Sequence, residues 1–423
     1  MRATRRHFLG AAASGLAAAR ALAPPGDRIR VAFIGCGGMG TGRIKHFLEH
    51  PDVEAAAVCD VDRSRLDRAA SLVESLRGRK PPAYGDFRRV LDRNDVDAVM
   101  IATPDHWHAL PAILACQAGI DVFVEKPFSW SIGEGRRMVE AARRHARVTQ
   151  MGNHIHNDLP NYRRVVELVR SGRLGRIVRV HCGLRSNEKS VGAPPDGPPP
   201  PELDYDFWLG PAPKRPYNPN RSHGKFRYFW DYSGGVFADF WCHFADVAYW
   251  ALDLRAPRAV AALGGRWLAE DNAETPDVFD AVFEYPGPVL LTWTQHPQGG
   301  PGFEHMGSCV VFEGTEATLV TNYSRHEVWV KGKPAPDFPR PDPSIPDSPG
   351  HIREFLDAIR SRNTQTTCNF QYSHRLNKAA LLANIAFRTG ARLEWDDQRE
   401  TVVNHKPANR FLLRRYRKPW KLA

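Results

Sequence analysis

The sequence predicts an α/β protein with two domains, the first built on a doubly wound parallel sheet. Three observations indicate this fold: a strand, a glycine-rich turn and a helix follow one another from Arg28, strands and helices then alternate to about residue 149, and alternating apolar and polar strand segments follow after residue 150. The length of 423 residues suits two or three domains. Hydrophobic residues make up 42% and charged residues 25%, which excludes wholesale disorder.

Residues 1–23 are predicted to be an export signal. The adjacent arginines Arg5 and Arg6 precede Phe8 and a short apolar run that ends in small residues, which is the pattern of a secretory signal. The paired arginines resemble the twin-arginine signal, so we expect a periplasmic or otherwise exported protein, cleaved after Ala23 or, alternatively, after Ala19. The N-terminal helix of a cytosolic protein stays open as the other interpretation.

The charge pattern argues against nucleic acid as a partner. Four arginines lie in the first 23 residues, so removal of that segment lowers the formal net charge from +11 to +7. One basic and aromatic run remains, Arg410 to Trp420 in the tail 401–423, and we expect it to pack on its own domain or on a second subunit. No uncharged apolar stretch reaches the roughly 18 residues that a membrane-spanning helix needs.

Seven cysteines are spread along the chain without any C-x-x-C pair. Their odd number and wide spacing predict neither a disulfide framework nor a thiolate zinc site.

The glycines after the first strand predict a dinucleotide site. Gly35, Gly37 and Gly40 form G-x-G-x-x-G between a strand and a helix, and a second strand follows. Such glycines let the backbone approach a pyrophosphate, and the helix N-terminus offers unpaired N–H groups. We therefore expect the dinucleotide to bind along Gly35, Gly37, Gly38, Met39 and Gly40.

Asp60 ends the second strand, 20 residues beyond Gly40. Its carboxylate would accept hydrogen bonds from both ribose hydroxyls and would repel a 2′-phosphate, so NAD is favoured over NADP. Arg63 and Arg65 keep NADP open.

The alternation continues through a helix over 63–76, a strand over 97–103, a helix over 107–118, a strand over 121–126 and a helix over 133–145. Ligands of such sheets bind beyond the carboxyl ends of strands. Two such ends carry the remaining candidate cofactor contacts, which are Thr103, Pro104, His106, Glu125 and Lys126.

The segment ATPDHWHALPAILACQAGIDVFVEKP, residues 102–127, resembles the signature of the Gfo/Idh/MocA oxidoreductases. The resemblance runs from Arg28 to about Trp395. It implies a Rossmann domain at 28–149 and a C-terminal α/β domain at 150–400 whose large, open, mostly antiparallel sheet covers the nicotinamide. It also implies a homo-oligomer formed through that sheet.

Residues 150–400 contain a helix over 159–170, a proline-rich loop over 193–201, several alternating strands, and two closing helices over 351–360 and 373–388. Between them, Asp239, His243 and Asp246 share one face of a helix. The resemblance transfers a D-x-x-x-H motif to Asp239 and His243, together with Lys126 as the third catalytic residue.

A sugar dehydrogenase must remove a hydroxyl proton with a base whose pKa lies near the working pH. We expect burial to depress the pKa of Lys126. Either Lys126 is the base, or His243 is the base and Lys126 polarises the oxygen, with Asp239 as orienting group. A capping Asp and a core His remain the alternative.

Four further side chains are predicted to bind substrate: His154, His156, Tyr232 and Trp241. Two H-x-H pairs, His106 with His108 and His154 with His156, could also hold zinc with Asp239. Imidazoles in a sugar pocket more often donate hydrogen bonds, so no metal is predicted.

Together these features predict an exported NAD(P)-dependent oxidoreductase that acts on a sugar, sugar derivative or polyol and recycles a tightly bound cofactor. The alternative is a redox-neutral glycoside hydrolase that oxidises, eliminates and re-reduces its substrate. A non-catalytic binding protein is the third possibility, because fold alone does not establish function.

Overall fold

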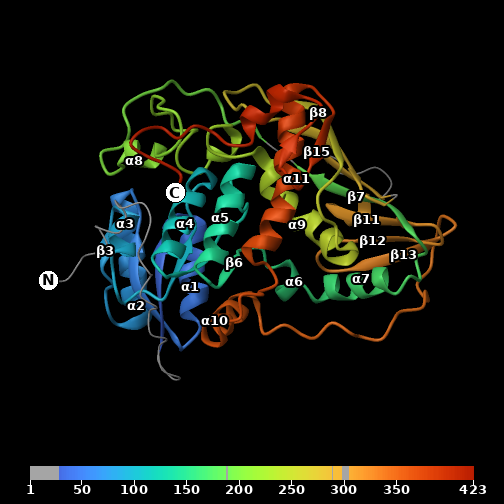
Figure 1. Ribbon diagram of the computed structural model, residues 1–423, viewed down its shortest axis with the longest axis horizontal. Coiled ribbons are helices and arrows are strands. Elements are labelled where there is room, and N and C mark those ends of the chain that lie inside the picture. The colour runs from blue at the N-terminus through green and yellow to red at the C-terminus, as the bar shows by residue number, and fades with distance from the viewer. Residues whose placement is uncertain (1–27, 187–188, 288, 298–303) are drawn as a thin grey trace.

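The computed structural model describes residues 28–186, 189–287, 289–297 and 304–423, so the predicted export signal lies outside the described residues. Figure 1 shows two layered halves side by side, with the smaller parallel sheet in the N-terminal half and the larger sheet in the C-terminal half. Within the described ranges, no helix has both the length and the apolar character that a bilayer span requires.

The first sheet has six parallel strands in the order β3-β2-β1-β4-β5-β6. Its strands are β1 (Ile29–Ile34), β2 (Val53–Cys59), β3 (Ala83–Tyr84), β4 (Ala98–Ile101), β5 (Asp121–Val124) and β6 (Thr149–Met151). The connecting helices are α1 (Gly38–Leu48), α2 (Arg63–Arg77), α3 (Phe87–Leu91), the 3₁₀ turn η2 (Asp105–Trp107), α4 (Ala109–Gln117) and α5 (Ile132–Arg144). The strand order reverses between β1 and β4, where such sheets bind dinucleotides, so the predicted Rossmann fold is confirmed.

The second sheet has ten strands in the order β14-β13-β12-β11-β7-β10-β9-β8-β15-β16. They are β7 (Ile177–Arg185), β8 (Ala259–Gly265), β9 (Val278–Tyr285), β10 (Val289–His296), β11 (Cys309–Gly314), β12 (Thr318–Thr321), β13 (His326–Val330), β14 (Lys333–Pro334), β15 (Leu393–Asp396) and β16 (Thr401–Val402). β7 and β10 pair in parallel and the other neighbours run antiparallel. The predicted large, mostly antiparallel sheet is therefore confirmed.

Helices cover one face of this sheet. α9 (Gly235–Leu252) and α11 (Phe370–Thr389) contact the strands, and α7 (Pro160–Arg170) packs against α9 after the short α6 (Ile155–Asp158). Trp241 of α9 meets Phe283 and Trp293 of the sheet with ring centroids 4.8 and 5.8 Å apart. The apolar face of α9 is thereby fixed, which leaves its other side for the site described below.

One helix departs from the expected arrangement. α10 (His351–Ser361) was expected to close the second domain, yet it packs on the first. Its Phe355 meets Phe47 and Phe123 edge-on, at centroid distances of 6.4 and 5.6 Å. The chain thus returns to the Rossmann half late in the sequence and completes its core there.

Two further segments also cross between the halves. The chain after β7 carries α8 (Tyr205–Leu209) and the 3₁₀ turn η3 (Phe226–Tyr228), and it bridges to the first domain at Asp62 and Leu203. After the 3₁₀ turn η5 (Lys406–Phe411), Arg414 donates to the carbonyls of Asp231 and His106. The basic tail therefore packs on its own chain. The remaining short turn is η4 (Glu304–Met306).

Candidate active site

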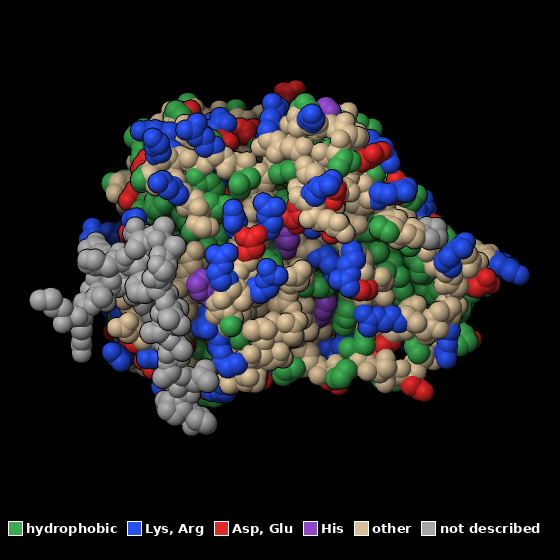
Figure 2. Space-filling model, in the orientation of Figure 1, with side chains coloured by type: hydrophobic (Ala, Val, Ile, Leu, Met, Phe, Trp, Pro, Cys, Tyr) green, Lys and Arg blue, Asp and Glu red, His purple; other side chains and the backbone are tan. Residues whose placement is uncertain are grey.

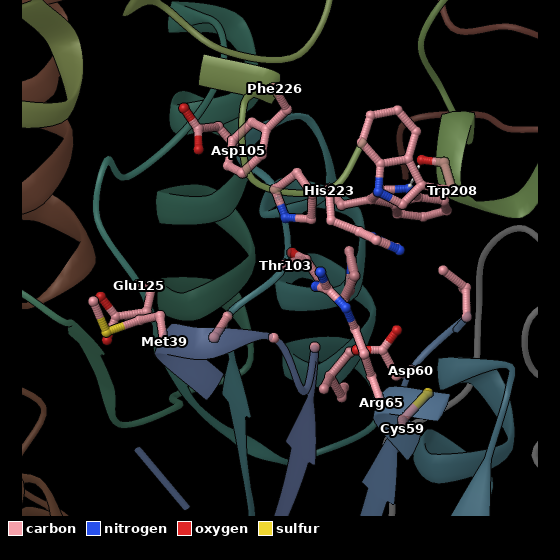
Figure 3. Close-up of a pocket in the computed structure, with 18 of the residues that line it drawn as sticks. Met39, Cys59, Asp60, Arg65, Thr103, Asp105, Glu125, Trp208, His223 and Phe226 are labelled. Atoms are coloured by element: carbon pink, nitrogen blue, oxygen red, sulfur yellow. Dashed lines mark hydrogen bonds between the residues drawn. The ribbon is translucent and has the colours of Figure 1, made fainter. Parts of the chain in front are cut away.

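A cavity of about 320 Å³ lies beyond the carboxyl ends of the first sheet. Figure 3 shows Asp60 and Arg65 at one end of it and Met39 and Glu125 at the other. Nine of the predicted cofactor contacts line it: Gly35, Gly37, Gly38, Met39, Asp60, Thr103, Pro104, Glu125 and Lys126.

The glycine turn has no room for side chains at two of its positions. Gly35 has φ +88°, and a Cβ there would lie 2.7 Å from the backbone of Ala102. A Cβ on Gly40 would lie 1.8 Å from the carbonyl oxygen of Gly35, so this predicted contact acts by packing and does not line the cavity. Apart from its chain neighbours and its own helix backbone, no atom of the described residues lies within 4 Å of where a Cβ on Gly38 would stand. This open backbone surface fits a pyrophosphate at the N-terminus of α1.

Backbone hydrogen bonds hold the Asp60 carboxylate in place. Its Oδ2 accepts from the N–H of Cys36 at 2.7 Å and its Oδ1 from the N–H of Asp62 at 2.9 Å. Burial raises the pKa of Asp60 and these two bonds oppose that shift. Arg65 lies beside it, with a guanidinium nitrogen 2.8 Å from where a Cβ on Gly37 would stand. The ribose end of the cavity therefore holds one carboxylate and one guanidinium.

The opposite end offers polar atoms without protein partners. Glu125 forms an ion pair with Arg43 through Oε1, while its Oε2 has no hydrogen-bond partner among the described residues. The hydroxyl of Thr103 is buried and lacks a partner in the same set. Buried polar atoms of this kind are normally hydrogen-bonded, so they fit a polar ligand in the cavity. The glycine cradle, Asp60 and these atoms together fit a dinucleotide.

Lys126 and Asp239 meet at the boundary between the two domains. Nζ of Lys126 lies 2.7 Å from Oδ1 of Asp239, and Nε of Arg227 lies 3.2 Å from the same oxygen. Burial raises the pKa of Asp239, but the two cations outweigh it and hold that pKa below its usual value. Asp239 is therefore a carboxylate shared by two cations.

The expected depression of the Lys126 pKa is wrong. Burial is the largest single influence and lowers the pKa, but the charge of Asp239, its hydrogen bond and the neighbouring Cys242 together outweigh burial, so the net shift is upward. Lys126 thus stays an ammonium ion, which can donate a hydrogen bond but cannot accept a proton.

His243 lies one helical turn after Asp239 on α9. Burial foremost, then the charge of Lys126, lowers the pKa of His243 to about 3. Its Nδ1 is buried and has no hydrogen-bond partner in the part of the chain that the structure describes. The ring therefore stays neutral at ordinary pH and has a lone pair or a proton to offer to a ligand.

Two open hollows are lined by ring neighbours of His243, although neither Asp239 nor His243 itself is among their lining residues. A groove of about 630 Å³ crosses the second sheet beside Phe240 and Tyr323, whose rings lie 5.5 and 6.3 Å from that of His243. A hollow of about 520 Å³ includes Met39 and His154, and the His154 ring lies 6.4 Å from that of His243. Figure 2 shows histidines among Lys and Arg side chains on the face where α1, α6 and α10 lie.

Four predicted site residues are buried away from these spaces. Trp241 is 1% exposed and its indole donates to the carbonyl of Leu376, so its prediction as a sugar platform is wrong because the protein core covers both faces. Tyr232 is fully buried in the cluster under α8, and His106 is buried against the carbonyl of Trp208. His156 stacks on Trp250 at 4.2 Å.

The H-x-H pairs do not converge on Asp239. His108 bonds to the carbonyls of Thr103 and Pro127, which ties together the two strand-end loops. His156 instead approaches Asp246, with Nε2 and Oδ1 3.2 Å apart, and these two lie near Cys368 with ligand atoms within 4.8 Å of one another. Tyr372 and Asn153 donate to that same Asp246, so hydrogen bonds already account for the group.

No sequence pattern marks several of the residues that line the cavity. Arg227 and His223 come from the irregular chain after β7, where no motif marks them. Arg43 lies on α1 at a position that the sequence suggests is exposed. Its ion pair with Glu125 could not be predicted, because only the fold brings the two residues together. Only the structure shows that Lys126 and Arg227 both approach Asp239.

Comparisons with known proteins agree with this architecture. A model described as an oxidoreductase family with an NAD-binding Rossmann fold matches residues 29–153, and the C-terminal alpha/beta domain of that oxidoreductase family matches residues 163–261 and 321–422. A glycosyl hydrolase family 109 protein of Shewanella pealeana is 34% identical over 163 residues. That match spans 37% of this chain and only 35% of the relative.

Two solved structures share the fold. The WlbA dehydrogenase of Bordetella pertussis, in complex with NADH and UDP-GlcNAcA, is 19% identical with a TM-score of 0.63, over 87% of this chain and 99% of that one. The aldose-aldose oxidoreductase of Caulobacter crescentus is 17% identical with a TM-score of 0.62, over the same shares. The cofactor prediction, NAD, is confirmed by the matched NAD-binding domain. The chain belongs to the Gfo/Idh/MocA family of oxidoreductases.

Proposed function

We propose that this protein oxidises a hydroxyl-bearing carbon of a sugar or polyol and returns the cofactor to its starting state within its own catalytic cycle. The carrying observation is the 2.7 Å ion pair between Lys126, which lines the dinucleotide cavity, and Asp239 of α9, with His243 one helical turn after Asp239. NAD, when bound, supplies the hydride acceptor for such chemistry.

The protonation states assign the roles. His243 is neutral, with a pKa of about 3, so its lone pair is free to take the hydroxyl proton of the substrate. Because so low a pKa makes a weak base, the proposal also needs Lys126 to lower the pKa of the substrate hydroxyl. Lys126 remains an ammonium and donates a hydrogen bond to the same substrate oxygen, and Asp239 orients Lys126. Of the two assignments that the sequence left open, the geometry therefore favours His243 as the base.

The direct test is incubation of the purified protein with a panel of sugars and polyols while bound nicotinamide is followed by absorbance and fluorescence. Reduction of bound NAD by one of them, reversed by a second carbonyl compound, supports the proposal. Absence of any redox change over the whole panel would favour the non-catalytic binding protein.

A second candidate function is redox-neutral glycoside hydrolysis. Elimination from an oxidised sugar needs a base for the acidified C–H bond next to the ketone. His154 is placed for this, since its ring lies 6.4 Å from that of His243, and burial foremost lowers its pKa. The family 109 glycosyl hydrolases among the relatives also support this candidate.

Product analysis separates the two candidates. A hydrolase in deuterated water releases a free sugar with deuterium at the carbon next to the oxidised position and needs no second carbonyl compound. An oxidoreductase releases an oxidised sugar and leaves glycosidic bonds intact.

Export and assembly complete the proposal. A periplasmic location would explain why the cofactor is recycled, since no free nicotinamide pool supports the enzyme there.

The outer face of the second sheet carries exposed Leu263, Val282 and Leu290, which fits a second copy of the chain. Light scattering of Leu263→Glu against the wild type tests whether that face forms the interface.

A further inference from the structure

We propose that residues 202–227, here called the closing segment, form a second wall of the dinucleotide site. We infer that the His223–Asp62 contact and the C-terminal tail hold this wall shut, so that NAD stays bound between turnovers. The inference rests on the proposed cofactor recycling, and it assigns residues of the second domain to cofactor retention.

The closing segment supplies much of the cavity lining. Figure 3 shows Trp208, His223 and Phe226 across the cavity from Asp60 and Arg65. Its lining residues are Phe207, Trp208, His223, Gly224, Phe226 and Arg227. Because three of them are aromatic, this wall offers ring faces to the flat parts of a dinucleotide.

Hydrogen bonds fasten the closing segment to the turn after β2. The N–H of Arg63 donates to the carbonyl of Glu202 at 2.9 Å, and the N–H of Asp204 donates to the carbonyl of Val61 at 3.0 Å. A backbone bridge joins Asp62 to Leu203. The wall is therefore attached to the loop that begins at Asp60.

His223 adds a side-chain contact at the same turn. Its Nε2 lies 2.9 Å from Oδ2 of Asp62, whose own N–H donates to Oδ1 of Asp60 at 2.9 Å. A chain of two hydrogen bonds thus connects the closing segment to the carboxylate of the ribose end. Separation of the wall would break the His223–Asp62 contact and leave the backbone hydrogen bonds to Asp60 in place.

The C-terminal tail supports the wall from behind. The ring of Trp420 lies 4.8 Å from Trp107 and 5.1 Å from Phe207, and both of these line the cavity. Arg417 donates to Asp206 at 2.8 Å and to the carbonyl of Gly210 at 3.0 Å. The tail therefore braces α8, so the wall and its brace together restrain one side of the cavity.

The experiment measures release of NADH from the full chain. Protein loaded with NADH is mixed with a large excess of NAD, and the loss of bound NADH fluorescence gives the dissociation rate. His223→Ala and Trp420→Ala should each speed release by about fivefold or more, as loss of one buried hydrogen bond or aromatic contact implies. His223→Gln, which can still donate to Asp62, should restore slow release.

Matched controls are His405→Ala in the tail and Trp267→Ala on an exposed loop, and both should release NADH at the wild-type rate. Circular dichroism verifies that each variant is folded. Wild-type release rates in both His223→Ala and Trp420→Ala would overturn the inference. NADH release needs no sugar, so a protein that oxidises no sugar but releases NADH slowly would refute the proposed function and leave the closing segment in place.

Discussion

Nζ of Lys126 and Oδ1 of Asp239 lie 2.7 Å apart across the boundary between the two domains. Lys126 follows the last residues of β5, and Asp239 lies in the first turns of α9, so neither domain alone holds the pair. Both side chains are about 10% exposed. A buried ion pair of this kind is costly to break by removal of one partner, and its position couples domain docking to the proposed chemistry.

Replacement of Lys126 by Met should slow chemistry and leave cofactor binding intact. The glycine turn and Asp60 keep most of the predicted dinucleotide contacts in this variant, whereas the proposed mechanism loses the hydrogen bond from Lys126 to the reacting oxygen. Single-turnover reduction of bound NAD by substrate should fall by about two to four orders of magnitude. Lys80→Met, an exposed lysine on the first domain, serves as the control.

The same assay tests whether Lys126 and His243 act as one unit. The rate of NAD reduction in His243→Ala should fall by a similar factor. In the double variant the rate should fall by much less than the product of the two single losses. Full-rate reduction in Lys126→Met would show that the ion pair is structural and would move the search for the base to His154.

Asp60→Ala should shift cofactor choice. The substitution removes the carboxylate that accepts hydrogen bonds from the ribose and repels a 2′-phosphate. The free energy of NAD binding should therefore become less favourable by about 1–3 kcal/mol. NADP should gain because Arg65 then faces its phosphate without a competing carboxylate. Titration calorimetry of both cofactors checks this, and addition of Arg65→Ala should cancel the gain for NADP. An unchanged preference for NAD would place Asp60 away from the ribose.

Gly40→Ala should lower the stability of the protein, whereas Gly37→Ala should lower its affinity for NAD. A Cβ on Gly40 would collide with the Gly35 carbonyl, so the free energy of unfolding should drop by about 2 kcal/mol or more. A Cβ on Gly37 meets only the flexible end of Arg65, so stability should stay within about 0.5 kcal/mol of the wild type. NAD affinity should nevertheless fall about tenfold or more, because the methyl group blocks close approach of the pyrophosphate. Denaturant titration and NAD binding, measured on both variants, distinguish packing from contact.

The half-buried imidazole of His243, whose Nδ1 is fully buried, should make the protein less stable in mild acid. Its pKa is about 3 in the folded state against 6.5 ordinarily, so between these values the unfolded chain binds the extra proton. Stability therefore falls as pH drops from 6.5 towards 3. His243→Gln should reduce the fall in unfolding free energy between pH 6.5 and 4 by up to about 3 kcal/mol. An equal slope in His243→Gln and His405→Gln would contradict this assignment.

Export should depend on the arginine pair. Lysine keeps the charge but lacks the planar guanidinium, so Arg5→Lys with Arg6→Lys should leave folded, cofactor-loaded protein in the cytoplasm. Cell fractionation with an antibody to the protein measures this. Arg20→Lys, outside the pair, should export normally, and a normal periplasmic yield of the double variant would exclude the twin-arginine route.

Sequence patterns predicted the elements whose signals are local. The glycine turn needs positive φ at Gly35, and the helix face of Asp239 and His243 follows from a spacing of four. Trp241 was predicted to bind substrate, but it lies in the core. The aromatic content of a sequence does not distinguish a ring in the core from a ring that lines a cavity. The charge state of Lys126 depends on a partner 113 residues away, which no local pattern encodes.

The late return of α10 to the first half sets the order in which the protein can mature. Phe47 and Phe123 lack their Phe355 cover until more than 350 residues have left the ribosome, and the brace at Trp420 is made later still. An early-folding N-terminal domain that captures NAD during synthesis is therefore not expected. We expect cofactor loading to follow the synthesis of both α10 and the residues around Trp420.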